Sequence, residues 1–240
     1  NLNMLSAHNI VAGYVDEIDI LQKVSVDVEQ NKITSVIGPN GSGKSTLMRV
    51  ICGFLTPKSG QVLWDGTDLT GRPSHGMAEL GICYLPQERT VFAHLTVEQN
   101  LRLGAWTFRR EKARIGAELQ RVYELFPLMR ERRKSKAGDL SGGMQKILEI
   151  ARGMMIKPQI LICDEPTVGL APIIAKEVYD TIERLKLDGL TILLVDQNVR
   201  EAIRVGDFVY VLEVGQNKIS GTKAEFETNL HDMIKDWLQI

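Results

Sequence analysis

Long apolar runs are missing from this sequence. No stretch approaches the roughly 18 to 20 continuous apolar residues that a helix needs to cross a bilayer. The N-terminal residues also lack the basic-then-apolar pattern of a secretory signal. We therefore expect a chain that is soluble by itself.

An excess of charge of one sign is also missing. The 29 Lys and Arg residues nearly balance the 30 Asp and Glu residues, so the formal net charge is −1. Nucleic-acid binding depends on neutralising many phosphates with a clustered basic surface. This balance gives no electrostatic reason to expect a nucleic acid as a partner, whereas small anions stay open as ligands.

Cysteine is scarce as well. Cys52, Cys83 and Cys163 are far apart, and each lies in an apolar context. A zinc site or a catalytic thiol would need CxxC spacing or a paired histidine, and the four histidines are scattered. We interpret the three cysteines as reduced core residues.

The composition that remains is ordinary for a globular protein, with 44% hydrophobic and 25% charged residues among 240. Short β-branched runs alternate with amphipathic stretches, which predicts an α/β sheet with helices on its faces. A helix is predicted from Lys44 to about Cys52. The predicted strands lie at 9–14, 24–28, 33–38, 61–64, 81–87, 159–166, 191–196 and 208–213.

One segment departs from this alternation. From about Glu88 to Met155 there is little strand character and a charged, amphipathic pattern, which predicts a helical insert. There are no long repeats or Pro-rich linkers, so the insert is predicted to belong to one folding unit. We predict a single domain over 1–240, in which 1–87 and 156–240 form the core with a β subdomain and 88–155 form a helical subdomain.

A glycine-rich loop lies between a predicted strand and a predicted helix. Its sequence GPNGSGKST fits the pattern GxxxxGK[ST], in which glycines let the backbone approach phosphates and a lysine reaches the β and γ phosphates. The serine after the lysine can hold Mg²⁺. The predicted nucleotide-binding residues are Gly38, Pro39, Asn40, Gly41, Ser42, Gly43, Lys44, Ser45 and Thr46.

Two acidic residues follow the apolar run ILIC. Asp164 emerges at the carboxyl end of that predicted strand, where ligands bind in open α/β sheets, and is placed to bind Mg²⁺ through water. Glu165 is the natural general base or orienter of the attacking water. A paired acidic turn after a core strand is the alternative, and the phosphate loop weakens it.

The third motif is LSGG at 140–143, followed by the helical run MQKILEIARGMM. Ser141, Gly142 and Gly143 are predicted to form an exposed helix N-terminus directed at an anion, although LSGG alone could be a helix cap. GPNGSGKST, LSGG and ILICDEP in this order resemble the ATP-binding cassette (ABC) family. The resemblance runs over nearly the whole chain.

This resemblance implies a fold, ligands and partners. The fold would be α/β, a P-loop NTPase cassette with a RecA-like core, an N-terminal antiparallel β subdomain and a helical insert. In the family, one subunit's LSGG loop closes on ATP held by the other subunit's phosphate loop. The resemblance therefore implies ATP and Mg²⁺ as cofactors, a head-to-tail homodimer or heterodimer of ATPase subunits, and attachment to membrane permeases at the cytoplasmic face. A periplasmic or extracellular binding protein would take part indirectly.

The resemblance also suggests roles for three further residues. Gln87 looks like the glutamine that senses Mg²⁺ or the attacking water. Tyr14 looks like the aromatic residue that stacks on adenine, and a core tyrosine at a strand end is an equal alternative. Gln197 stands where most cassettes carry a histidine that contacts the γ-phosphate.

Gln197 is one of several departures from the usual pattern. Ala171 replaces the usual aspartate after DEPT, and Met144 replaces the glutamine after LSGG. A cassette without hydrolysis must be considered, but Lys44 and Glu165 are present and a glutamine can still donate a hydrogen bond to phosphate. We expect hydrolysis to survive.

The departures also bear on the substrate. GLAP and LVDQN, with HLTVEQNLRLGA, LFPLMRER and VYVLEVGQ, resemble the ATPases of branched-chain amino-acid importers. YLPQE and DQNVREAI also resemble the cassettes that power lipopolysaccharide extraction. A soluble cassette for DNA repair or translation, and a nucleotide-binding regulator without turnover, are further alternatives.

The segment after Gln87 is predicted to face the membrane subunit. Val91, Phe92 and Leu95 are its candidate exposed apolar contacts. Filling the core of the helical insert is an equally good interpretation of these residues.

Overall fold

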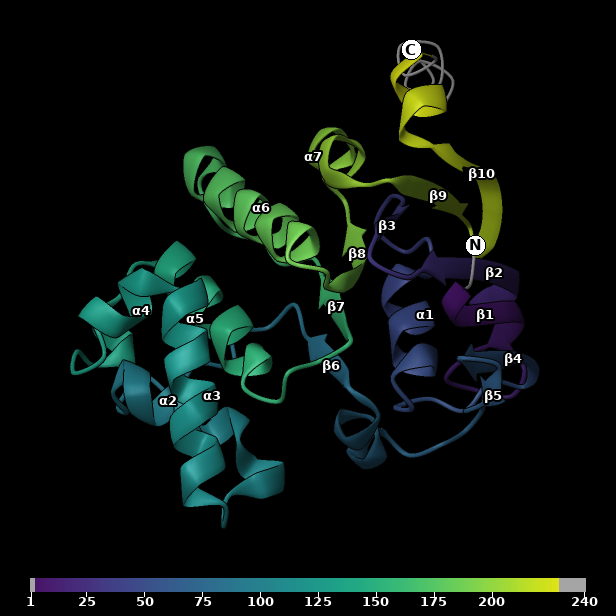
Figure 1. Ribbon diagram of the computed structural model, residues 1–240. Helices are drawn as coiled ribbons and strands as arrows, with labels where there is room; N and C mark the ends of the chain where they lie inside the picture. Colours follow the sequence, from purple (N-terminus) through teal and green to yellow (C-terminus); the bar gives the residue numbers. More distant parts are fainter. Residues whose placement is uncertain (1–2, 229–240) are drawn as a thin grey trace. The chain divides into compact units, whose positions relative to one another are not determined.

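A computed structural model describes residues 3–228 of the chain (Figure 1). The described chain divides into two compact units. The first contains the residues up to Ser74 and those from Thr191 onward, and the second runs from His75 to Leu190.

An antiparallel sheet opens the first unit, with strand order β2-β1-β4-β5. In β2 the buried positions alternate with more exposed ones, as expected for a strand with one face on a core. The predicted strand 9–14 was wrong in its bounds, because the observed strand starts earlier and leaves Tyr14 in the loop that follows. The strands are β1 (Asn3–Ala12), β2 (Leu21–Glu29), β4 (Ser59–Trp64) and β5 (Thr67–Asp68).

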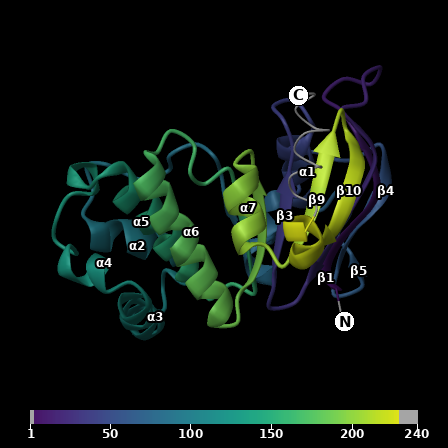
Figure 2. The same ribbon diagram turned by 90° about the horizontal axis from the view of Figure 1, so that it is seen from above.

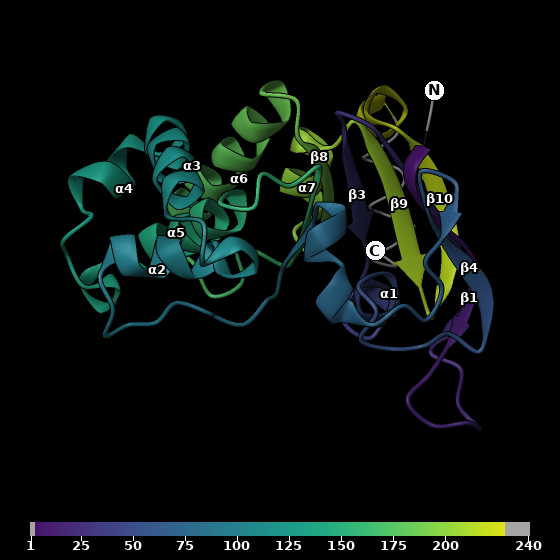
Figure 3. The same ribbon diagram turned by 60° about the horizontal axis from the view of Figure 1, so that its bottom comes forward.

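The second set of strands in this unit has β3 at its centre. β3 pairs in parallel with β8 and with β9, and β10 pairs antiparallel with β9 (Figures 2 and 3). Every residue of β3 and β8 is buried, including the polar residues Thr34 and Ser35 of β3. The elements are β3 (Ile33–Ile37), α1 (Lys44–Ile51), β8 (Thr191–Asp196), α7 (Val199–Val205), β9 (Phe208–Glu213) and β10 (Gln216–Thr222).

The second unit combines a parallel strand pair with several helices. β6 pairs with β7 from Ile82↔Ile160 to Leu85↔Cys163. Between these strands the chain is helical, which confirms the predicted helical character of the segment after Glu88. The elements are η1 (Ser74–Gly76), at the unit boundary, η2 (Ala78–Leu80), β6 (Ile82–Leu85), α2 (Val97–Gly104), η3 (Trp106–Phe108), α3 (Lys112–Leu125), α4 (Pro127–Glu131), η4 (Ala137–Asp139), α5 (Gly142–Met154), β7 (Ile160–Asp164) and α6 (Pro172–Leu187).

Local sequence signals explain several helix ends. Thr96 caps α2 in a capping box, because its hydroxyl accepts from Gln99 N while the Gln99 side chain accepts from Thr96 N. Pro127 and Pro172 start α4 and α6, where the missing N–H costs nothing. Within residues 3–228, no helix is both long and apolar enough to span a bilayer.

Candidate functional site

A tight loop joins β3 to α1 and contains the predicted phosphate-binding residues. Gly41 and Gly43 have φ of 80° and 100°, in the region that favours glycine. A Cβ at Gly43 would lie 2.6 Å from Leu21 Cδ2, and one at Gly38 would lie 2.4 Å from Leu212 O. The loop conformation therefore requires glycine at these positions.

Lys44 begins α1 with its side chain buried inside this loop. Its Nζ donates to Gly38 O at 2.7 Å and to Pro39 O at 3.1 Å. The first turn of α1 carries no acidic residue, so the positive end of the helix dipole is not neutralised there. Ser42 Oγ is buried with no hydrogen-bond partner among the described residues. These donors at a helix N-terminus fit an anionic phosphate group.

Gln197 lies at the same sheet edge as the phosphate loop. Strands β3 and β8 pair in parallel with Ile37 opposite Asp196, so Gly38 and Gln197 are the next residues at adjacent carboxyl ends. The Gln197 residue is exposed there. Carboxyl ends of parallel strands are where ligands bind in open α/β sheets.

Tyr14 lies beside the helix that follows the loop. The phenol ring is 54% exposed, so it is not the core tyrosine that the alternative interpretation required. Its hydroxyl is 3.4 Å from Thr46 Oγ1, and Arg49 Cζ lies 5.7 Å from the ring centroid. An exposed aromatic face next to a phosphate-loop helix can stack on a planar base.

The acidic pair lies at the carboxyl end of β7. Asp164 and Glu165 are 4% and 6% exposed, although they follow each other in sequence. Glu165 has φ of 44°, which is uncommon for a residue with a side chain. Gln87 Nε2 donates to Glu165 Oε2 at 3.2 Å, so the structure brings these two predicted catalytic residues together.

A tyrosine missed in the sequence contacts the same acidic pair. Tyr84 Oη donates to Asp164 Oδ2 at 3.1 Å. Tyr84 lies in β6, whose register places it opposite Ile162, two residues before Asp164. The signal that could have found it is the position of Tyr84 near the end of a predicted strand, but the sequence does not indicate that this strand pairs with the acidic one.

Mg²⁺ fits this donor set only with help from a nucleotide. Within the described part of the chain, no group of three or more His, Cys, Asp or Glu side chains could hold a metal ion. Mg²⁺ is commonly bound through one or two carboxylates with water and substrate phosphates. The exposed Ser45 hydroxyl in the first unit and the buried Asp164 carboxylate in the second are each oxygen ligands of the kind that Mg²⁺ prefers.

The LSGG segment starts α5. Ser141 is the N-cap, and its Oγ accepts a hydrogen bond from Met144 N at 3.3 Å. A Cβ at Gly143 would lie 2.1 Å from Ile174 Cγ2 of α6, so glycine allows the close approach of the two helices. The cap and the two glycines leave Ser141 exposed at the helix N-terminus.

Three charged side chains of α5 hold the segment that follows Gln87. Lys146 Nζ lies 2.6 Å from Glu149 Oε2 and 3.5 Å from Pro86 O. Glu149 accepts from Thr90 N, and Arg152 donates to Thr90 O at 2.8 Å. Charged side chains on successive turns of α5 therefore fix the backbone on either side of Gln87.

Burial shifts the pKa of Arg152, which belongs to this cluster, and the pKa of the nearby Cys83 thiol. Desolvation raises the pKa of the Cys83 thiol to about 12, against a smaller opposing effect of the Arg152 charge. Desolvation also lowers the pKa of Arg152, while Glu149 opposes that change. Cys83 therefore stays a neutral thiol at physiological pH. Cys52 and Cys163 are buried, as the interpretation of core residues expects, whereas Cys83 is half-buried.

Phe92 is the exposed apolar residue of this segment. It is 53% exposed, while Val91 and Leu95 are half-buried. The buried Asn100 holds its backbone, because Asn100 Oδ1 accepts from Phe92 N at 2.9 Å and Nδ2 donates to Phe92 O at 3.0 Å. Arg152 Cζ lies 5.8 Å from the Phe92 ring centroid.

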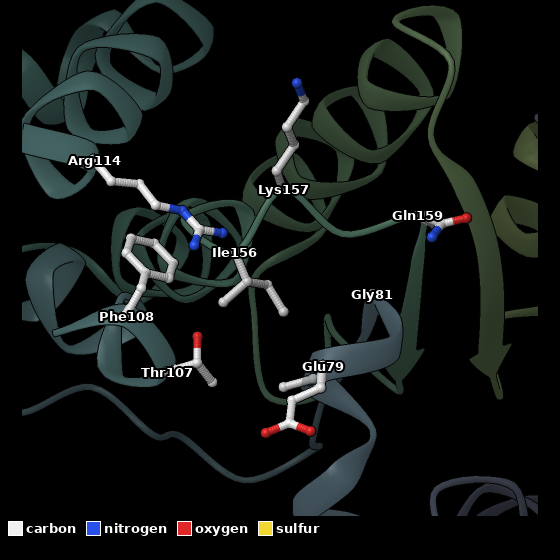
Figure 4. Close-up of a pocket in the computed structure, with 9 residues that line it drawn as sticks. Glu79, Gly81, Thr107, Phe108, Arg114, Ile156, Lys157 and Gln159 are labelled. Atoms are coloured by element: carbon white, nitrogen blue, oxygen red, sulfur yellow. The ribbon is translucent and has the colours of Figure 1, made fainter. Parts of the chain in front are cut away.

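The same unit contains a cavity of about 380 Å³ (Figure 4). Its walls come from η2, η3, the start of α3 and the turn between α5 and β7. Arg114 Cζ stacks 4.1 Å from the Phe108 ring centroid on one wall, and Glu79 and Lys157 add charges of opposite sign.

The glycine loop before α1 and the buried acidic pair after β7 define a P-loop nucleoside triphosphatase. The ABC transporter family model matches residues 21–168, and the chain belongs to that family of ATPases. Its fold is the ABC cassette: a crystal structure of an ABC transporter's ATP-binding cassette in its ADP conformation superposes with a TM-score of 0.86 at 30% identity. That match covers 97% of this chain and 96% of the other.

Several named transport proteins are similar to this chain over most of its length. The chain is 41% identical to the high-affinity branched-chain amino acid transport ATP-binding protein BraG of Pseudomonas aeruginosa, over 91% of this chain and 93% of BraG. It is 45% identical to the probable branched-chain amino acid transport protein LivF of Archaeoglobus fulgidus, over 92% and 93%. Identity to the lipopolysaccharide export protein LptB of Escherichia coli K12 is 33%, over 95% and 94%.

Proposed function

We propose that this chain is the ATP-hydrolysing subunit of an ABC importer for branched-chain amino acids. The observation that carries the substrate class is the higher identity to BraG and LivF than to LptB. We propose that residues 1–240 act as one cassette domain, with 88–155 as its helical subdomain. The lipopolysaccharide exporter is the second candidate, and a regulator outside transport is the third.

The phosphates bind to the loop before α1. Lys44, now bonded to two loop carbonyls, turns its ammonium group to the β and γ phosphates, and the loop backbone from Gly38 to Gly43 surrounds them. Tyr14 stacks on the adenine. Ser45, Gln87 and Asp164 would hold Mg²⁺, which when bound would neutralise charge on the phosphates.

Hydrolysis needs a water in line with the γ-phosphate. Glu165 accepts a hydrogen bond from that water and takes its proton as the oxygen attacks phosphorus. Gln87 supports this role, because its amide holds the Glu165 carboxylate in one orientation. Gln197 donates to a γ-phosphate oxygen in place of the usual histidine.

The active form is a pair of cassettes. Ser141, Gly142 and Gly143 of one subunit close on the nucleotide held by the other subunit. The second subunit is a copy of this chain or a related ATPase. Contacts to the γ-phosphate that ADP cannot make favour the closed pair, so hydrolysis releases it.

The pair works at the cytoplasmic face of the membrane, bound to permease subunits. Support comes from Phe92, a large apolar side chain that is exposed on the segment fixed to α5. A permease helix contacts Phe92, and the substrate-binding protein acts through the permeases. Nucleic acid plays no part.

Purification of the native complex from membranes tests this function. We expect copurification of permease subunits and Mg²⁺-dependent phosphate release that rises with a leucine-loaded binding protein. Copurification with lipopolysaccharide-extracting membrane proteins would favour the second candidate. ATP binding without phosphate release or membrane partners would favour the third.

A further inference from the structure

The loop between β1 and β2, residues 13–20, has a closed and defined shape. It projects beyond the end of β1 and is drawn in purple in Figure 3. Val15 and Ile18 form a β-bridge across it, and Ile20 N donates to Ala12 O at 2.8 Å at its base. A Cβ at Gly13 would lie 1.8 Å from Ile18 O, so the two sides of the loop are in close contact.

Burial does not explain this shape. Every residue from Tyr14 to Asp19 is exposed, so the loop gains little free energy from apolar contacts. Exposed segments of this kind are otherwise among the most mobile parts of a protein. Polar bonds to a neighbouring element must therefore hold it.

Lys58 supplies those bonds. Its Nζ donates to Asp16 O at 2.7 Å and lies 2.6 Å from Asp19 Oδ1, with a longer bond of 3.4 Å to Ile18 O. The backbone of Lys58 is itself fixed, because Lys58 N donates to Val11 O of β1 at 2.7 Å. One ammonium group thus uses its three donors on three oxygens of a single loop.

Tyr14 connects this loop to the nucleotide site. It follows Gly13 directly, and its hydroxyl and ring reach Thr46 and Arg49 of α1. The direction of the Tyr14 ring therefore depends on the path of the loop that carries it. That path depends on Lys58.

We propose that Lys58 is a positioning residue for the nucleotide base, which acts by holding the 13–20 loop so that Tyr14 lies against adenine. This inference rests on the adenine-stacking role of Tyr14 in the proposed function. Among residues 3–228, the hydrogen bonds and the ion pair of the Lys58 side chain go to the 13–20 loop and not to the phosphate loop, so its effect is limited to the base. It should therefore strengthen the binding of ATP and leave the binding of a base-free triphosphate unchanged.

Equilibrium titration of the full-length protein with Mg²⁺ and either ATP or inorganic tripolyphosphate tests this inference. Lys58→Met keeps the apolar stem of the side chain, and Lys58→Arg keeps its hydrogen-bond donors. The other variants are Tyr14→Ala and the double variant that combines Lys58→Met with Tyr14→Ala. Lys32→Met is the matched control, because Lys32 forms an exposed ion pair with Glu29 at 2.9 Å in the same unit.

We expect Lys58→Met to weaken ATP binding about fivefold and Tyr14→Ala about tenfold, the size of one lost stacking contact. The double variant should be no weaker than Tyr14→Ala, since Lys58 acts through Tyr14. Lys58→Arg and Lys32→Met should bind ATP like the unaltered protein. Tripolyphosphate binding should be the same in all five.

The outcomes separate the two claims. Unchanged ATP binding by Tyr14→Ala overturns the stacking role of Tyr14 and the inference with it. Weaker ATP binding by Tyr14→Ala but not by Lys58→Met overturns the inference alone. Equal weakening of ATP and tripolyphosphate by Lys58→Met shows general loosening of the site and also overturns it.

Discussion

Glu165 shows how a single residue is prepared for chemistry. Its backbone has φ of 44°, and conformations of this kind cost free energy that the surrounding structure must supply. In this conformation the Glu165 carboxylate is almost fully buried. Its direction is fixed because Gln87 donates a hydrogen bond to it at 3.2 Å. A water held by such a group is oriented before the reaction begins.

Replacing Glu165 by Gln should therefore slow steady-state phosphate release by about 100-fold or more, the usual share of a general base. ATP should still bind, since the amide has the same shape and the phosphate loop is unaltered. The trapped ATP should stabilise the closed pair, seen as a dimer by size-exclusion chromatography with Mg²⁺ and ATP.

The exposed Glu177 on α6 provides the control, because Glu177→Gln makes the same chemical change away from the site. It should leave phosphate release unchanged. Normal turnover and a monomer with ATP for Glu165→Gln would show that Glu165 has neither role.

At this scale short motifs in the sequence point to candidate site residues, whereas the residues that support them carry no such signal. Lys44 and Asp164 lie in short patterns that can be recognised without knowing the fold. Tyr84 and Lys58 carry no such pattern, because their partners Asp164 and Asp19 lie far away along the chain. Only the strand register and the loop path bring these pairs together.

In the second unit, helix α5 connects the LSGG segment to the segment around Gln87. Its N-terminus presents Ser141, and its next turns carry Lys146 and Glu149, which are 6% and 2% exposed. Buried charges are costly unless they are paired and bonded. Here Lys146 and Glu149 are paired with each other and bonded to the segment around Gln87. These bonds attach that segment to α5.

Removing one partner of this pair should be costly. Glu149→Gln leaves the Lys146 ammonium group buried without its counter-charge, which should lower the free energy of unfolding by about 3 kcal/mol. Urea unfolding followed by circular dichroism measures the change.

The matched control is Asp180→Asn on α6. Asp180 pairs with Lys176 at 3.0 Å, but the two side chains are 44% and 64% exposed, so the loss should be clearly smaller than for Glu149→Gln. Equal losses for Glu149→Gln and Asp180→Asn would contradict the structural role of the buried pair.

Elements were predicted best where burial was complete. Strands β3, β7 and β8 are buried at every position, and each appeared in the sequence as a short run rich in β-branched or other apolar residues. β10 was missed because most of its residues are exposed and show no alternation; its backbone pairing with β9 defines it. The first strand was placed too late for a different reason: β1 is mostly buried but its pattern does not alternate regularly, and its register with β2 shifts at several points.

For the whole molecule, the main consequence of the proposed function is that one chain would contribute only halves of two sites. The phosphate loop and Ser141 would serve different nucleotides in a paired assembly. Sequence could predict this only through the family resemblance, because no pattern within one chain reports the surface of a second subunit. The same holds for the permeases and the transported substrate.

Complementation tests whether the sites are shared between two copies. Lys44→Ala should abolish hydrolysis because it disables the phosphate loop. Ser141→Arg should abolish it because it disables the LSGG segment that closes on the partner's nucleotide. An equal mixture should recover about one quarter of normal phosphate release, because half of the pairs combine both variants and each of these has one intact site.

A mixture of two samples that both carry Lys44→Ala is the control and should stay inactive. If the mixture of different variants is also inactive, the functional partner is not a second copy of this chain. A heterodimer with a related ATPase subunit would then be the arrangement to test.

The most direct test of the importer assignment is ATP hydrolysis by the complete complex in lipid nanodiscs. The complex should be assayed with its binding protein, with and without leucine, isoleucine or valine, and separately with lipopolysaccharide. We predict that the branched-chain amino acids raise Mg²⁺-dependent phosphate release and that lipopolysaccharide does not. A rise with lipopolysaccharide alone, or no response to any of the three amino acids, would contradict the assignment.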